Sequence, residues 1–185
     1  MQSKSDIITT LQQEADAITQ TINTLSDVEF VTGTDERWSA EGYLKHLILS
    51  VKPFASGLKL PPEQLAKRFG TTDNGSMSYQ TLVDKYEEAM QSGVRAESTP
   101  NVVPVNYRFP DDVSDERAHL VSTWAEANQR LINALENWSE DALDTHQLPH
   151  PAMGMITIRE MCFFTVHHNQ YHHGDIKTSA QLANT

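Results

Sequence analysis

The sequence contains a single cysteine, Cys162, among its 185 residues. One thiol cannot form a disulfide within the chain, which fits a reducing compartment. Positive charge is also scarce, because 14 Lys and Arg residues stand against 25 Asp and Glu residues, giving a formal net charge of −11. Such an acidic chain lacks the clustered cations that bind nucleic-acid backbones or anionic membrane surfaces.

Long apolar runs are absent too. No segment approaches the ~20 apolar residues of a membrane span. The polar start, Met1 to Asp6, lacks the apolar core of a signal peptide. We therefore expect a cytoplasmic protein without a nucleic-acid or membrane partner. Hydrophobic residues make up 38% of the chain and charged residues 21%, as in an ordinary globular protein. A chain of this length most simply forms one domain, 1–185.

What the chain does contain is apolar residues at steps of three and four, a periodicity that predicts amphipathic helices. The periodicity predicts an all-α four-helix bundle. Its helices are expected at 3–25, at 40–52, at 78–92 plus 114–138 as the middle pair, and at 158–178. Start signals are the Ser3–Asp6 pair, the caps Ser39 and Ser114, and the Thr157–Glu160 pair. Pro53 and Gly93 are expected to end their helices.

Besides a connection at 30–37 that contains Gly33, three longer connections separate these helices. The first, 54–78, carries turn residues and one short helix at 62–69. The second, 94–113, contains three prolines between apolar residues, which favour an extended loop packed over the bundle and over a site. The third, 139–156, is interpreted as a linker.

Histidines concentrate in the last helix, where half of the chain's eight lie between His167 and His173. His168 and His172 are four residues apart, so a helix places both rings on one face. They also continue the apolar stripe of that helix. Buried imidazoles need hydrogen bonds or a metal ion, and a metal supplies coordination to neutral rings. The alternative is a histidine-rich exposed helix end.

A third ligand would have to come from another helix, and His46 is the best candidate because it lies inside the segment 40–52. An isolated histidine at such a position can also be a core residue with a hydrogen-bonded neighbour. His119 is a weaker option, and His146 and His150 could be loop ligands or line the site. Cys162 is interpreted as a core residue rather than a nucleophile.

Several motifs, in this order and spacing, resemble the DinB/YfiT superfamily of metal-dependent proteins. They are Trp38-Ser39-Ala40-Glu41…His46-Leu47, Leu148-Pro149-His150-Pro151…Gly154…Thr157-Ile158-Arg159-Glu160 and Phe163-Phe164-Thr165…His168…His172-His173-Gly174-Asp175-Ile176. The resemblance implies an up-down-down-up four-helix bundle with a long crossover, and a homodimer. It also implies a metal held by His46, His168 and His172. The chain departs from the family's usual run after the last ligand, where Asp175 could orient an imidazole or replace a water as ligand.

Three neutral imidazoles leave a divalent ion, zinc or nickel first and iron next, with an open coordination position. The resemblance implies a thiol-dependent transferase or a hydrolase that acts on a small molecule, with a low-molecular-weight thiol as partner. The alternative is a non-catalytic metal-binding bundle that serves as a stress-related binding or interaction module. A fourth protein ligand that closes the site would favour this second function.

Overall fold

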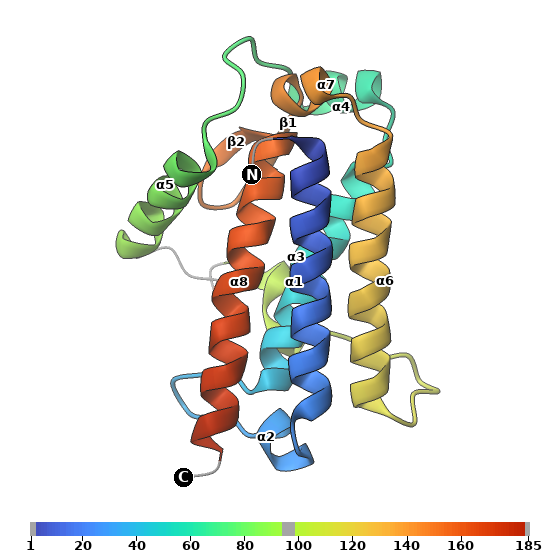
Figure 1. Ribbon diagram of the computed structural model, residues 1–185, viewed down its shortest axis with the longest axis vertical. Coiled ribbons are helices and arrows are strands. Elements are labelled where there is room, and N and C mark those ends of the chain that lie inside the picture. The colour runs from blue at the N-terminus through green and yellow to red at the C-terminus, as the bar shows by residue number, and fades with distance from the viewer. Residues whose placement is uncertain (1–2, 94–98, 184–185) are drawn as a thin grey trace.

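The computed structural model describes residues 3–93 and 99–183, most of which are helical (Figure 1). The bundle consists of α1 (Lys4–Thr24), α3 (Ala40–Gly57), α6 (Glu116–Glu136) and α8 (Ile158–Leu182). Both α1 and α3 pack against α6 and α8, so the four helices enclose one core. In Figure 1, α1 and α8 run in one direction and α3 and α6 in the other. The predicted all-α fold is confirmed.

Reciprocal hydrogen bonds fix the starts of α1 and α8. The Ser3 hydroxyl accepts from the Asp6 N–H while the Asp6 carboxylate accepts from the Ser3 N–H. Thr157 and Glu160 form the same capping box at the start of α8. Because this box fixes where α8 begins, it also sets which faces its histidines occupy. The start of α6 is one residue later than predicted, since Asp115 caps the helix.

The prediction that α3 ends before Pro53 is wrong, because the helix continues for one more turn. Proline lacks the N–H that would bond the carbonyl four residues earlier. Phe54 and Ala55 are nevertheless buried in the core, and the Trp138 indole N–H donates to the Leu58 carbonyl at 3.1 Å. Packing of this last turn outweighs the lost helical hydrogen bond.

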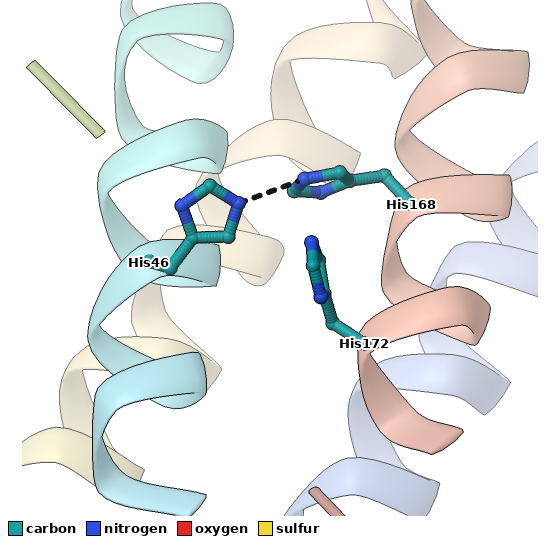
Figure 2. A group of neighbouring side chains, drawn as sticks. All are labelled: His46, His168 and His172. Carbon is teal, nitrogen blue, oxygen red and sulfur yellow. Dashed lines mark hydrogen bonds between the residues drawn. The ribbon is translucent and has the colours of Figure 1, made fainter. Parts of the chain in front are cut away.

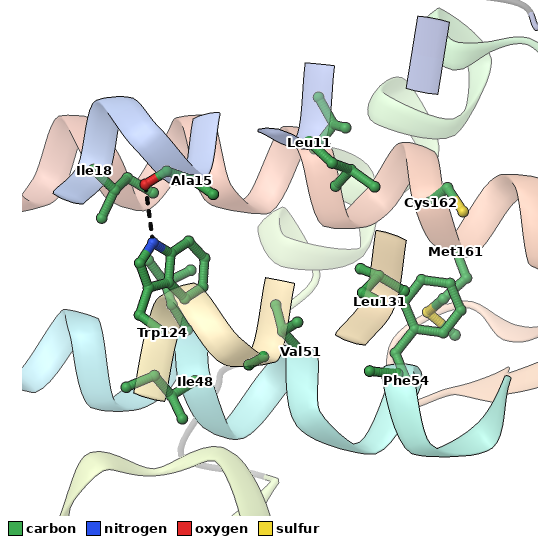
Figure 3. Close-up of a cluster of buried hydrophobic side chains, with 14 of the residues drawn as sticks. Leu11, Ala15, Ile18, Ile48, Val51, Phe54, Trp124, Leu131, Met161 and Cys162 are labelled. Atoms are coloured by element: carbon green, nitrogen blue, oxygen red, sulfur yellow. Dashed lines mark hydrogen bonds between the residues drawn. The ribbon is translucent and has the colours of Figure 1, made fainter. Parts of the chain in front are cut away.

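Trp124 on α6 is the largest fully buried side chain and lies near the centre of the bundle (Figure 3). Its indole N–H donates to the Ala15 carbonyl of α1 at 3.1 Å, so the ring is buried without an unpaired donor. Figure 3 also shows the apolar residues Leu11, Ile18, Ile48, Val51 and Leu131. Burial of such side chains stabilises the fold by roughly 1.5–3 kcal/mol each.

The remaining helices lie around this bundle. They are α2 (Asp27–Val31), α4 (Pro62–Phe69), α5 (Tyr79–Gln91), α7 (Glu140–Thr145) and the 3-10 turns η2 (Pro100–Val102) and η3 (Pro104–Asn106). The segment predicted at 78–92 packs on α8 from outside the bundle, since α5 buries only Leu82 and Val83 (Figure 1). No helix within the described parts of the chain combines the length and apolar character of a membrane span.

The linker predicted at 139–156 contains regular structure, so that prediction is wrong. After α7, β1 (Gln147–His150) pairs antiparallel with β2 (Gly154–Thr157) in a two-stranded hairpin. Pro149 is tolerated because both strands of such a hairpin are edge strands. The positive φ of +72° at Gly154 allows the chain to turn into β2.

A buried arginine fastens this region to the start of α8. The Arg159 side chain is 9% exposed and donates to both carboxylate oxygens of Asp144 and to Glu140. The Ser76 hydroxyl donates to the same Asp144 and joins the connection before α5 to the network. Burial acts to raise the pKa of Asp144, but the hydrogen bonds from Arg159 and Ser76 and the positive charge of Arg159 lower it.

Candidate metal centre

Three histidines from two bundle helices meet in one place (Figure 2). His46 comes from α3, while His168 and His172 come from successive turns of α8. One ring nitrogen from each lies within 4.8 Å of the others, and the Nε2 atoms of His46 and His168 are 2.9 Å apart. The structure thus brings together the three residues that the sequence had singled out.

Hydrogen bonds behind the rings set their orientation. The His46 Nδ1–H donates to the Val102 carbonyl at 2.8 Å, so the neutral ring presents its Nε2 lone pair to the centre. The Nδ1 of His172 lies 2.9 Å from an Asp175 oxygen, and the other Asp175 oxygen accepts from Arg37 at 3.0 Å. Carboxylates and carbonyls in this position commonly orient metal-binding histidines. The contact with Val102 also places part of the segment 94–113 over the site, as predicted, although residues 94–98 lie outside the described residues.

Burial keeps two of the three rings uncharged. Burial, with a smaller contribution from the nearby His172, lowers the pKa of His46 to about 4 against the opposing effect of the Val102 hydrogen bond. Burial also holds the pKa of His168 well below its usual value, with the neighbouring histidines adding to this shift. Neutral imidazoles are the form that binds metals, so His46 and His168 need not lose a proton at pH 7.

The donor set fits a divalent transition-metal ion. Imidazole nitrogens bind zinc at ~2.0–2.1 Å, which places ligands of one ion roughly 3–4 Å from each other. The spread of up to 4.8 Å among the three nitrogens requires only small ring movements to meet this condition. Three nitrogen donors suit zinc, nickel, iron or copper better than magnesium or calcium, which prefer oxygen.

The other histidines of the α8 cluster point elsewhere. The His173 ring contacts the Thr21 hydroxyl of α1 at 2.8 Å, and the His167 ring packs edge-on against Tyr86 of α5 at 5.9 Å. Neither belongs to the group of three. Cys162 is fully buried and its pKa is raised, as expected for a core thiol.

The further candidates His119, His146 and His150 do not join the group either. His119 contacts the Tyr107 hydroxyl, and His146 packs against Trp138. His150 lines the cavity next to the site, which was one of the two roles that the sequence left open.

This cavity has a volume of about 1090 Å³ and includes all three histidines in its wall. Its lining comes from the segment before α3 and from α3, α4, α5, the η2 region, the hairpin and α8. Most side chains are apolar or aromatic, with charge supplied by Arg37, Arg68 and a few carboxylates. Sequence reasoning did not predict the cavity, because its walls come from segments that meet only in the folded chain. Large, mostly apolar cavities with a few polar groups are typical of small-molecule sites.

Comparison with known families agrees with this geometry. The model of the DinB superfamily matches residues 10–176, and the chain belongs to that superfamily. No curated protein and no solved structure gives a significant match. Membership of the superfamily and the cluster of three histidines together fit a metal-binding protein.

Proposed function

We propose that this protein is a metal-dependent enzyme that acts on a small molecule at the His46, His168 and His172 site. The observation that carries the proposal is the position of the three histidines in the wall of a cavity of about 1090 Å³. A purely structural metal site is closed by a fourth protein ligand, whereas a catalytic site keeps a position open. Within the described chain, the ligand group contains no fourth residue.

Asp175 is the nearest candidate for a fourth ligand, and its contacts argue against that role. One of its oxygens lies 2.9 Å from His172 Nδ1 and the other accepts from Arg37 at 3.0 Å. Both oxygens therefore have partners on the side of His172 that faces away from the other two rings. We infer that Asp175 orients His172 and leaves the open position to a substrate.

The chemistry of the site favours an anionic partner. A bound divalent ion supplies a Lewis acid with an open position for water, a thiolate or a carboxylate. Three neutral ligands do not reduce the ion's double positive charge, which favours a thiolate. We propose zinc or nickel as the metal, with iron next. Thiol-dependent transfer is the leading reaction class and hydrolysis follows it. The cytoplasmic location and the homodimer stay predictions.

Metal removal is expected to abolish the activity. The protein is purified without a histidine tag, treated with a chelator, and reloaded with zinc, nickel or ferrous iron separately. Each form is then tested with low-molecular-weight thiols such as glutathione and a chromogenic aryl halide as electrophile. We expect turnover to disappear with the chelator and to return with at least one ion.

Activity that survives exhaustive metal removal would contradict the proposal. One bound ion without turnover of any thiol, electrophile or ester would instead favour the non-catalytic bundle.

Replacing Asp175 with Asn is expected to weaken metal binding by about 10–100-fold, because the neutral amide polarises and orients His172 less strongly. The dissociation constant is measured by competition with a chromogenic chelator. Asp35→Asn is the matched control, since Asp35 also lines the cavity but forms no hydrogen bond to a histidine of the described chain. Equal effects of the two variants would show that only the charge in the cavity matters.

A further inference from the structure

His150 is a buried polar residue that does not belong to the proposed metal-binding trio. It lies at the end of β1, is 7% exposed and lines the same cavity as the three histidines. Its Nδ1 accepts a hydrogen bond from the Ala152 N–H at 3.1 Å. A nitrogen that accepts a hydrogen bond carries no hydrogen, so the neutral ring has its hydrogen on Nε2. The turn of the hairpin thus fixes the tautomer of His150.

The remaining N–H of His150 has no acceptor among the residues that the structure describes. Burial lowers the pKa of His150 to about 4, so at pH 7 the ring is a neutral donor of one hydrogen bond. The buried side-chain atoms without a partner in the described structure belong to Asn128 and Asn169, so the His150 Nε2 is not sealed in the core but opens on the cavity that His150 lines. A donor that faces a cavity is available to an oxygen atom of a ligand.

One aromatic ring contacts both His150 and a histidine of the metal site. The Phe164 ring centroid lies 4.2 Å from that of His150 and 5.0 Å from that of His168. Tyr86 packs edge-on against Phe164 at 5.0 Å and closes the same aromatic group. A ligand that reaches both His168 and His150 therefore meets the Phe164 ring, a surface that favours a flat apolar group.

We propose that His150 recognises the substrate through a hydrogen bond from Nε2–H to a carboxylate or carbonyl oxygen. The substrate class follows from the order of the contacts. An anionic head group lies at His46, His168 and His172, an aryl or similarly flat group lies on Phe164, and an oxygen acceptor lies at His150. This inference rests on the proposed metal site and adds the chemistry of the ligand to it.

The test uses two thiols that differ in one group. 4-Mercaptobenzoate has a thiolate head, one ring and a carboxylate at the far end, whereas 4-methylbenzenethiol has a methyl group in place of the carboxylate. Both are titrated into cobalt-loaded protein, and the thiolate-to-cobalt absorption band gives each dissociation constant without any need for turnover. The quantity of interest is the ratio of the two constants, compared between wild type and variants.

In His150→Phe, the preference for 4-mercaptobenzoate should fall by at least about tenfold, as expected for one hydrogen bond to a charged group. Binding of 4-methylbenzenethiol should change little, because phenylalanine preserves the aromatic wall. His150→Gln, which keeps an N–H donor, should retain part of the preference. Cobalt content and circular dichroism confirm that both variants are folded and loaded.

An unchanged ratio of the two dissociation constants in His150→Phe overturns the inference, and this includes the case in which both thiols bind equally more weakly. These outcomes leave the metal site intact as a proposal. Failure of the wild type to bind cobalt, or to show a thiolate band, would instead overturn the proposed function and this inference with it.

Discussion

Alanine at His46, His168 or His172 is expected to abolish stoichiometric metal binding, whereas His167→Ala and His173→Ala should keep one ion per chain. Each residue of the trio supplies one of the three converging nitrogens. Loss of an outer partner of a metal ligand typically weakens binding ~10–100-fold. Removal of a direct ligand should weaken metal binding by more than this.

The two control positions are well matched because they lie on the same helix beside the trio. Each is rotated ~100° from its neighbour in the trio, at 3.6 residues per turn. Their rings contact Tyr86 and Thr21 instead of the centre. Metal content is measured by mass spectrometry on five untagged single variants. Loss of the ion in His167→Ala or His173→Ala, with retention in His168→Ala, would show that the ligand set is wrong.

The metal-free protein should lose stability steeply as the pH falls from 7 to about 4.5. The pKa values of His46 and His150 are lowered to about 4 in the folded chain, while an unfolded histidine titrates near 6.5. The unfolded state therefore binds more protons throughout this window, so the stability is fully present above pH 6.5 and falls as the pH falls. The expected loss is roughly 2–3 kcal/mol for each ring.

The measurement is urea unfolding of chelator-treated protein at several pH values. His150→Phe lacks one of these buried imidazoles and is not one of the proposed ligands, so its free energy of unfolding should depend less on pH. A free energy that stays constant between pH 7 and 4.5 would contradict the prediction, since it would mean that the buried rings accept protons without a penalty.

The helices and the trio of histidines could be predicted because their signals are local or periodic. The Thr157–Glu160 box fixed the start of α8, and a spacing of four then placed His168 and His172 on one face. His46 could be predicted as the third member of the trio because it lies inside a second amphipathic helix. The α2 helix was missed although Ser26 and Glu29 carry the same type of capping signal, because its helix is only five residues long.

Other features depend on contacts between distant parts of the chain. The turn of α3 beyond Pro53 persists because the tertiary core buries Phe54, which a local propensity rule cannot include. The hairpin was missed because both strands are only four residues long and β1 contains a proline, so neither strand gives a clear alternation. The contacts of His46 with Val102 and of Asp175 with Arg37 join segments 56 and 138 residues apart, so no spacing rule predicts them.

The separation of the proposed ligands along the chain also sets the order in which they are synthesised. His46 and His168 are 122 positions apart. Translation at 5–20 residues per second needs on the order of 10 seconds to produce that stretch. During this time a nascent chain exposes His46 without its partners, and only completion of α8 supplies them. In the proposed metal site, acquisition of an ion would therefore follow translation of the last bundle helix, and three-histidine coordination would not nucleate the folding of a nascent chain.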